Sequence, residues 1–171
     1  IFNDADNNLI NLYRCVKYHC EELQRQLHED CLNSRTLFED CKAQLHAGGL
    51  TDIQRASRYY IMIRISYGAD RRSFGCSKAA LYGPIAQLPE IRERLKNVLI
   101  ECKDFEKLIA DYDSPGTIFY LDPPYYGAER FYDTAFPESD HYRLKQCLNG
   151  IKGQFILSYN NHPKIIEIYD G

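Results

Sequence analysis

The chain has 171 residues, 44% of them hydrophobic and 26% charged, and a formal net charge of −3, which is the composition of a globular domain with a sizeable core. No apolar run approaches the ~20 residues of a membrane-spanning helix, and the first residues lack the charged-then-apolar pattern of a secretion signal. We therefore expect a cytoplasmic protein without a membrane partner.

The first part of the chain is predicted to be mostly helical. Residues 1–4 have the pattern of the end of a β-strand. Apolar side chains spaced alternately four and three residues apart predict one helix over residues 7–28. These side chains are Leu9, Tyr13, Val16, Cys20, Leu23 and Leu27. A second helix is expected over residues 34–46, with Gly48 after its end.

Two further helices are expected before the chain changes character. Thr51 and Gln54 have the spacing of a capping box, which predicts the start of a helix that runs to about residue 67. Residues 68–75 have the composition of a basic loop. Pro89 suits the first turn of another helix, over residues 89–96.

From residue 98 onward, short apolar strands alternate with helices. Strands are predicted over residues 98–102, 117–121 and 154–159, and helices over 104–111 and 139–149. This alternation is typical of βαβ units and predicts a parallel sheet covered on both faces. The fold class is therefore predicted to be α/β.

The cysteines do not indicate a metal site. There are seven of them and no CxxC pair, and the closest two, Cys15 and Cys20, lack a matching second pair. His19 adds one possible ligand, which is too few. We expect reduced, mostly buried thiols and no bound metal.

The charges are unevenly distributed. Residues 51–100 carry nine basic and four acidic side chains, a charge of +5, between flanks of −3 and −5. A basic middle suits a nucleic-acid contact surface despite the negative total. An ordinary solvated helix face explains the charge equally well.

The strand predicted over residues 117–121 ends abruptly in Asp122-Pro-Pro-Tyr125, the DPPY corner. Ligands of open parallel sheets bind beyond the carboxyl ends of strands, and the prolines fix φ near about −65° without offering a donor. The corner thus presents a carboxylate, rigid carbonyls and an aromatic ring. These groups suit a flat ligand with an amino group, such as a base turned out of a nucleic acid. The alternative is an ordinary strand-ending loop.

Four segments carry a resemblance to a known family. They are Asn3–Tyr13, Arg55–Lys78, Lys103–Phe105, and the DPPY corner with the later Ser158–Asn160. In their order along the chain they resemble the Dam-like N6-adenine DNA methyltransferases of the alpha arrangement. The resemblance implies a Rossmann-like methyltransferase sheet over residues 1–20 and 97–171, with a helical target-recognition insert over 21–96. It also implies a prokaryotic or phage-encoded enzyme.

The resemblance implies a reaction for the DPPY corner. A methyl group would pass from S-adenosylmethionine to the exocyclic N6 of a flipped adenine in double-stranded DNA. Asp122 and the Pro123 carbonyl would accept hydrogen bonds from the amino group, Pro124 would keep the corner rigid, and Tyr125 would stack on the ring. Positioning and electrostatics would then do the catalysis.

The resemblance also implies cofactor-binding residues. They are Asp4 for the ribose hydroxyls, Asp104 and Phe105 for the adenine of the cofactor, and Asp122. For Asp4 the alternative is helix capping, which Asp6 or Asn7 could equally supply. For Asp104 and Phe105 the alternative is a cap and a core side chain.

The candidate DNA contacts lie mainly in the basic middle. They are Arg55, Arg58, Arg71, Arg72 and Lys78, with Tyr132 on the loop after the corner. Arginines bind phosphates or guanine edges. The helical Arg55 and Arg58 could instead be plain surface, so the loop pair Arg71 and Arg72 is favoured.

One part of the family pattern is not found. The family opens with a strand and a glycine-rich FxGxG-type turn, and no such turn precedes Asp4. We therefore expect a fragment that binds the cofactor weakly and turns over little.

Three alternatives stay open. The first is an inactive, methyltransferase-like DNA-binding fragment. The second is a methyltransferase for cytosine N4 or a glutamine side chain, although those families more often have Asn or Ser where Asp122 stands. The third is cofactor binding without nucleic acid. The sequence leaves open the DNA recognition sequence, the oligomeric state, and whether a restriction–modification system is involved.

Overall fold

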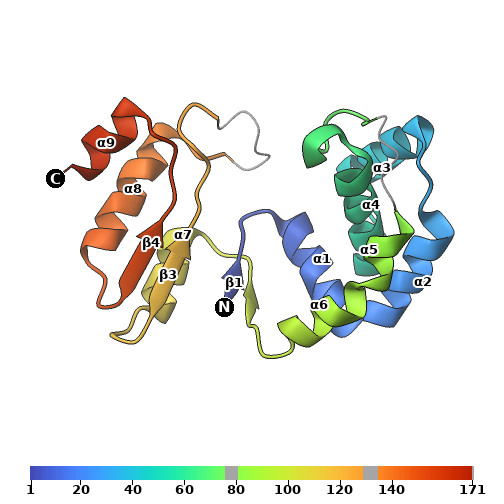
Figure 1. Cartoon of the computed structure of the whole chain (residues 1–171), viewed down its shortest axis with the longest axis horizontal. Helices are drawn as coiled ribbons and strands as arrows, with labels where there is room; N and C mark the ends of the chain where they lie inside the picture. The colour runs from blue at the N-terminus through green and yellow to red at the C-terminus, as the bar shows by residue number, and fades with distance from the viewer. Residues whose placement is uncertain (76–80, 129–134, 171) are drawn as a thin grey trace. The chain divides into compact units, whose positions relative to one another are not determined.

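A computed structural model describes residues 1–75, 81–128 and 135–170 (Figure 1). Lys78 and Tyr132, both predicted to contact DNA, lie outside the described residues. The chain divides after Cys102 into two compact units, each with a hydrophobic core of its own. The predicted division into an α/β domain and a helical insert stays a prediction.

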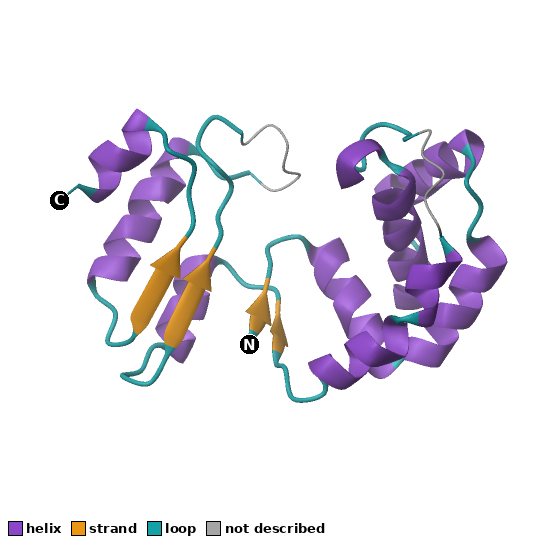
Figure 2. Cartoon of the chain, viewed as in Figure 1, coloured by secondary structure: helices purple, strands orange, loops and turns teal. Residues whose placement is uncertain are grey.

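Unit 1 is largely helical, with a very short strand near each end (Figure 2). The strands β1 (Phe2–Asn3) and β2 (Ile100–Glu101) pair in parallel. The helices are α1 (Asn7–Tyr18), α2 (Cys20–Asp30), α3 (Arg35–Ala47), α4 (Asp52–Ile65), α5 (Tyr82–Ala86) and α6 (Leu88–Leu95), with a short 3₁₀ turn, η1 (Tyr67–Ala69). Helix α4 contacts α1, α2 and α3.

The prediction of a single helix over residues 7–28 is wrong, because this segment forms two helices, α1 and α2. His19 breaks it with φ −134° and ψ 36°, while its N–H still donates to the carbonyl of Cys15 at 2.8 Å. The apolar spacing continues across the break, and Val16, Cys20 and Leu23 are all buried. The sequence pattern therefore shows the buried face but not the break.

The predicted helix ends at residues 47–54 are confirmed. Gly48 follows α3 with φ 76°, a conformation that favours glycine. At the start of α4, the Thr51 hydroxyl accepts from the Gln54 N–H at 3.3 Å, and the Gln54 side chain accepts from the Thr51 N–H at 3.1 Å. This is the reciprocal capping box that the spacing predicted.

Helix α4 ends at Ile65, two residues earlier than predicted, and α5 was not predicted at all. Five residues, with Pro84 among them, are too few to show a helical period in the sequence. The helix predicted from Pro89 is confirmed as α6, with the proline in its first turn.

The core of unit 1 is built from α1 to α6 and holds four thiols. Cys15, Cys20, Cys31 and Cys41 are buried and unpaired, as predicted. Burial raises the pKa of the Cys15, Cys31 and Cys41 thiols to about 11. They act as small apolar side chains, since a neutral thiol is a poor nucleophile.

In its described residues unit 2 has two parallel strands, with one helix before them, one between them and one after them. Strand β3 (Ile118–Leu121) pairs with β4 (Gln154–Leu157) along its whole length. The helices are α7 (Phe105–Tyr112), α8 (Glu138–Asn149) and α9 (Pro163–Tyr169). Helix α9 was not predicted. Its signals are Pro163 in the first turn and the His162 ring, whose Nδ1 accepts from the Lys164 N–H at 3.1 Å.

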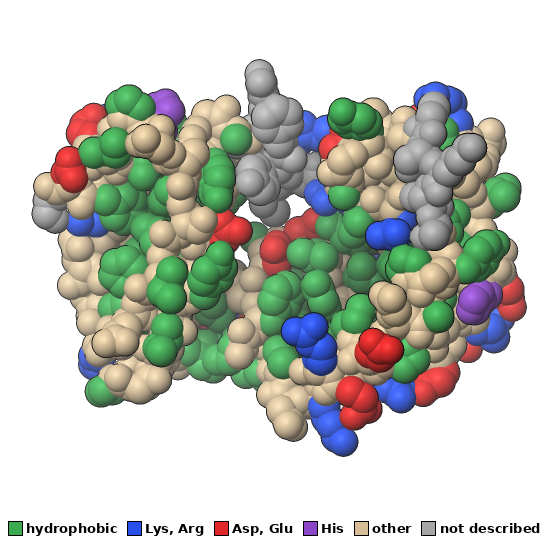
Figure 3. All heavy atoms as spheres, in the orientation of Figure 1, with side chains coloured by type: hydrophobic (Ala, Val, Ile, Leu, Met, Phe, Trp, Pro, Cys, Tyr) green, Lys and Arg blue, Asp and Glu red, His purple; other side chains and the backbone are tan. Residues whose placement is uncertain are grey.

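Of the predicted parallel sheet, the parallel direction of the strands is confirmed, but a single continuous sheet is not seen in the described residues. The described strands form two separate pairs, and within the described part of unit 2 the side chains on one face of the β3–β4 pair are exposed. On that face Ile118, Tyr120 and Ile156 are 66%, 69% and 59% exposed. Figure 3 shows hydrophobic side chains gathered over these strands. The other face packs Phe119 and Leu121 in the second core.

The starting ends of β3 and β4 are held together by one carboxylate. Asp113 accepts from the backbone N–H groups of Lys152 and Gly153 at 2.8–3.0 Å, and these bonds lower its pKa.

None of the helices within the described ranges has the length and apolar character that crossing a bilayer requires.

Candidate active site

The DPPY corner and the segment Ser158–Asn160 follow β3 and β4, whose ends point the same way (Figure 2). The Ser158 N–H donates to the carbonyl of Leu121 at 2.9 Å, so the pairing continues one step past the named strands. This bond fixes the second segment against the end of β3, directly before the corner. The carboxyl ends of two parallel strands thus carry the candidate site, the usual place for a ligand in such sheets.

Asp122 is the exposed member of the corner. Its neighbours Pro123, Pro124 and Tyr125 are half-buried. Within residues 1–75, 81–128 and 135–170, no group donates a hydrogen bond to the Asp122 carboxylate or forms an ion pair with it. An exposed acceptor next to rigid backbone is chemically able to receive an amino group.

The Tyr125 ring is held by residues that follow β4. Its hydroxyl forms a 3.1 Å hydrogen bond with the Ser158 hydroxyl. Its ring lies 6.4 Å from that of Tyr159, centroid to centroid. Ser158–Asn160 belong to the family pattern in the sequence, which predicted no individual role for them.

Tyr126, the second tyrosine, is anchored more firmly. The Asn160 side-chain amide donates to its carbonyl at 3.1 Å, and its own hydroxyl donates to Glu138 at 2.9 Å. Its ring lies 4.6 Å from that of His162. These contacts set the direction in which the chain leaves the corner.

His141 on α8 was missed by the sequence analysis, although its side chain is fully buried. Its Nδ1 and the Tyr159 hydroxyl lie 2.6 Å apart. The centroids of the His141 and Phe136 rings lie 4.9 Å apart, with the two rings nearly perpendicular. Burial raises the pKa of Tyr159, so this phenol stays protonated near neutral pH. A lone histidine in a helix gives no sequence signal, because it counts as polar in the apolar pattern.

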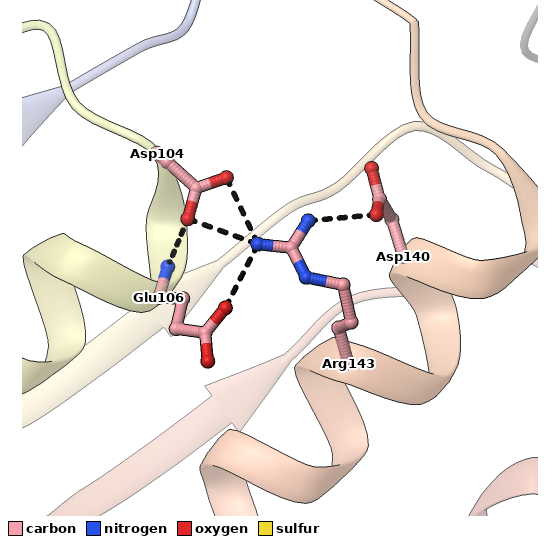
Figure 4. A network of polar contacts seen from close by, with 4 residues as sticks. All are labelled: Asp104, Glu106, Asp140 and Arg143. Carbon is pink, nitrogen blue, oxygen red and sulfur yellow. Dashed lines mark hydrogen bonds and ion pairs between the residues drawn. The ribbon is translucent and has the colours of Figure 1, made fainter.

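Asp104 and Phe105 lie at the start of α7, and Asp104 contacts Arg143 (Figure 4). Asp104 caps the helix by accepting from the Glu106 N–H at 3.0 Å, and both of its oxygens lie 3.2 Å from an Arg143 nitrogen. Arg143 also bonds Asp140 and Glu106, and it lies over the Phe105 ring at 4.8 Å. These carboxylates raise the pKa of Arg143. Asp104 thus caps α7, and the role of Asp104 and Phe105 in binding the cofactor stays a prediction.

Asp4 follows β1 in unit 1 and is half-buried. Its Oδ1 accepts from the Asp6 N–H at 2.7 Å. The Ala5 backbone N–H acts on the same carboxylate, whose oxygens can still accept further hydrogen bonds, for example from a ligand hydroxyl. Burial raises the pKa of Asp4; repulsion from Asp6 adds to this, and attraction to Arg71 opposes it.

Asp6, and not Asp4, is the cap of α1. It accepts from the Asn8 and Leu9 N–H groups at 2.8 and 3.3 Å. Its other oxygen accepts from the buried Tyr59 hydroxyl at 2.6 Å and lies 3.8 Å from an Arg71 nitrogen. Helix capping, the alternative role considered for Asp4, is therefore performed by Asp6.

Arg71 and Arg72 differ although they are adjacent. Arg71 is turned toward Asp6 and lies over the Tyr59 ring at 5.2 Å, while Arg72 is exposed. Ala69 and Arg71 have φ values of 60° and 58°, a left-handed conformation that costs non-glycine residues ~1–3 kcal/mol. The Ser66 hydroxyl accepts from the Arg71 N–H at 3.0 Å and offsets part of this cost.

The two helical arginines predicted to contact DNA form intramolecular pairs. Arg58 bonds Asp30 and, at 2.8 Å, the Gln44 side chain, and only 16% of its side chain is exposed. Arg55 pairs with the exposed Asp52 at 3.3 Å. A role in DNA binding stays a prediction for both residues.

No group of three or more potential metal ligands occurs in the part of the chain that the structure describes.

The comparisons with known proteins decide the family. A family model described as D12 class N6 adenine-specific DNA methyltransferase matches residues 1–171, the whole chain. The chain belongs to this family. A curated relative, the Type II methyltransferase M1.LlaDCHI of Lactococcus lactis subsp. cremoris, is 25% identical over 193 residues. That alignment covers 99% of this chain and 68% of the relative.

The resemblance inferred from the sequence is therefore confirmed at the level of the D12 family, and the chain is of the adenine-specific DNA methyltransferase type. Its α/β composition agrees with this assignment. Members of such a family generally use S-adenosylmethionine and act on DNA.

Proposed function

We propose that this chain methylates the exocyclic N6 of adenine in double-stranded DNA, and that the adenine enters the DPPY corner after leaving the base stack. The observation that carries the proposal is the exposed Asp122 carboxylate, without a described donor, beside a Tyr125 ring held by Ser158. The D12 family supplies the reaction class. A Rossmann-like sheet and a cytoplasmic restriction–modification role are part of the same proposal.

The corner residues suit the chemistry of an amino group. The N6 lone pair of adenine is delocalised into the ring, so the nitrogen is a weak nucleophile. Asp122 accepts one amino hydrogen and the Pro123 carbonyl accepts the other, which favours a pyramidal nitrogen with its lone pair directed outward. Pro124 keeps the two acceptors rigid, and Tyr125 stacks on the ring.

S-adenosylmethionine, when bound, supplies an electrophilic methyl group. Asp4 is the residue of this chain that fits it best, because its half-buried carboxylate follows β1 and has lone pairs left to accept from a ribose hydroxyl. Asp104 and Phe105 fit less well, since Arg143 contacts both. We keep them as candidates for the cofactor adenine, with Arg143 in competition.

The natural full-length protein, incubated with unmethylated DNA and S-adenosylmethionine, should produce N6-methyladenine, detected by mass spectrometry of the nucleosides. N4-methylcytosine in its place would assign the protein to the other class of amino methyltransferase. Absence of any methylated base would contradict the proposal.

The variant that tests the corner is Asp122→Ala. Methylation should fall by ~10³-fold, because an acceptor aligned for the transition state is lost, while DNA affinity changes less than ~2-fold. Asp111→Ala is the matched control, since among the described residues this carboxylate pairs with Lys103 alone and is largely exposed. An equal loss of methylation and DNA affinity in Asp122→Ala would mean that the corner is structural.

A further inference from the structure

Arg71 is placed to act on the Asp4 turn and not on DNA phosphate. The sequence offered Arg71 and Arg72 together as DNA contacts, but only Arg71 has its side chain packed inside unit 1. Its side chain is 21% exposed and that of its partner Asp6 is 16% exposed. A phosphate contact has to be reachable from solvent, which suits the exposed Arg72 better.

The loop over residues 66–75 is built to hold this orientation. The Arg71 N–H donates to the Ser66 hydroxyl, and the Asp70 carboxylate accepts from the Arg72 and Ser73 N–H groups at 2.8 and 3.1 Å. Gly75 passes so close to the Ser66 backbone that an added Cβ would lie 2.9 Å from it. Left-handed backbone at Arg71 persists only where surroundings of this kind enforce it.

The target of Arg71 is the turn that carries Asp4. Asp6 binds Arg71 and Tyr59 through one oxygen, and caps α1 through the other. The Asp6 N–H is in turn the donor to Asp4 Oδ1. Arg71 is therefore two contacts away from the carboxylate that we propose for the cofactor ribose.

We propose that Arg71, with Tyr59, positions the Asp4–Asp6 turn for the cofactor, so that a residue predicted to contact DNA serves cofactor binding. This inference rests on the proposed role of Asp4. It makes Arg71 a positioning residue, since it acts through Asp6. It also separates the two arginines by function, with Arg72 left on the exposed side of the loop.

Arg71→Gln and its neighbour Arg72→Gln form a matched pair for the test. Arg71→Gln should weaken binding of S-adenosylmethionine to the full-length protein ~10-fold, because the cation that pairs with Asp6 in the turn is lost, and should leave the salt dependence of DNA binding unchanged. Arg72→Gln should do the reverse, flattening the salt dependence by about one phosphate contact. Calorimetry and DNA binding at several salt concentrations measure both.

A second readout does not depend on cofactor binding. The charged groups that act on Asp4 are Asp6, which raises its pKa, and Arg71, which lowers it; Tyr59 and Cys102 lie near enough to be affected by it but stay neutral below pH 8. Removing Arg71 should therefore raise the Asp4 pKa in the protein without ligand, measured by carboxyl NMR. Arg72→Gln should leave it unchanged, and Arg71→Lys should restore it in part.

The outcomes distinguish this inference from the proposed function. If the wild type binds cofactor and Arg71→Gln binds it equally, with an unchanged Asp4 pKa, the inference is wrong and Asp4 keeps its role. If Arg71→Gln flattens the salt dependence as Arg72→Gln does, Arg71 is a phosphate contact. If the Asp4 pKa responds to Arg71 but Asp4→Asn binds cofactor normally, the proposed role of Asp4 fails, and with it the inference.

Discussion

The Tyr125 hydroxyl is the contact through which β4 acts on the corner. If the bond to Ser158 orients the ring, then Tyr125→Phe and Ser158→Ala should each slow methylation by up to ~10-fold, the effect of one net hydrogen bond. The double variant should be no slower than either single one, because both remove the same interaction. Single-turnover methylation rates of the wild type, the two single variants and the double variant measure this coupling.

A hydroxyl pair at the other end of β3 provides the control. Ser114 and Thr117 form a 2.9 Å contact there, so Ser114→Ala should change stability slightly and the methylation rate not at all. Additive losses in the Tyr125 and Ser158 double variant would show that the two residues act independently.

Arg58 and Arg55 lie one turn apart on α4 and make unequal pairs. Arg58→Ala leaves Asp30 without its charged partner in a mostly buried place, so the free energy of unfolding should fall by ~2–3 kcal/mol. Arg55→Ala removes an exposed pair and should change it by less than about 0.5 kcal/mol. Urea unfolding measures both.

DNA binding decides whether Arg58 has a second role. We expect Arg58→Ala to keep the wild-type salt dependence of DNA binding, because its side chain is committed to Asp30 and Gln44. A slope reduced by about one unit, with unchanged stability, would instead restore Arg58 as a phosphate contact.

At the scale of elements, Gly153 allows β4 to begin beside β3. An added Cβ would lie 2.4 Å from the Thr117 carbonyl oxygen, whereas at Gly150 its nearest contact would be an ordinary 3.8 Å. Gly153→Ala should therefore destabilise unit 2 by ~1–3 kcal/mol, and Gly150→Ala by less than ~1 kcal/mol. Equal effects of the two substitutions in thermal unfolding would mean that β4 can move away from the Thr117 carbonyl without a cost in stability.

Local signals predicted the elements that have them. The capping box of Thr51 and Gln54, the glycine after α3 and the proline in α6 were all confirmed, because each depends on neighbours in the chain. The break at His19 could not be predicted, since the apolar spacing runs through it. Contacts such as Tyr125 with Ser158 join residues 33 positions apart, and no local pattern encodes them.

The same distinction holds for the candidate site. The DPPY corner is contiguous, so its residues could be named from the sequence. The orientation of Arg71 could not, because it depends on Tyr59 from α4 and Asp6 from the start of α1. Charge alone made Arg71 and Arg72 look equivalent.

At the scale of the whole molecule, two cores that share no residue should lose their structure separately. The Met62 methyl group, from the only methionine of the chain, reports on the first core, and the buried His141 ring reports on unit 2. We expect their NMR signals to disappear at different urea concentrations. Two probes of the first core, Met62 and Ile85, should give one midpoint. A single midpoint for all three would show that the units unfold together.

The left-handed backbone at Ala69 and Arg71 limits how this protein can be re-engineered. Exchanging DNA-recognition segments between relatives is an obvious route to new methylation specificities, and the basic loop over residues 68–75 looks like a convenient place to cut. A graft that shifts the loop by one residue could put Arg72 in the left-handed place of Arg71, turned toward Asp6, and move Arg71 to the place of Asp70. Chimaeras should therefore keep Ser66–Gly75 with the helices of unit 1 and take the foreign segment from elsewhere.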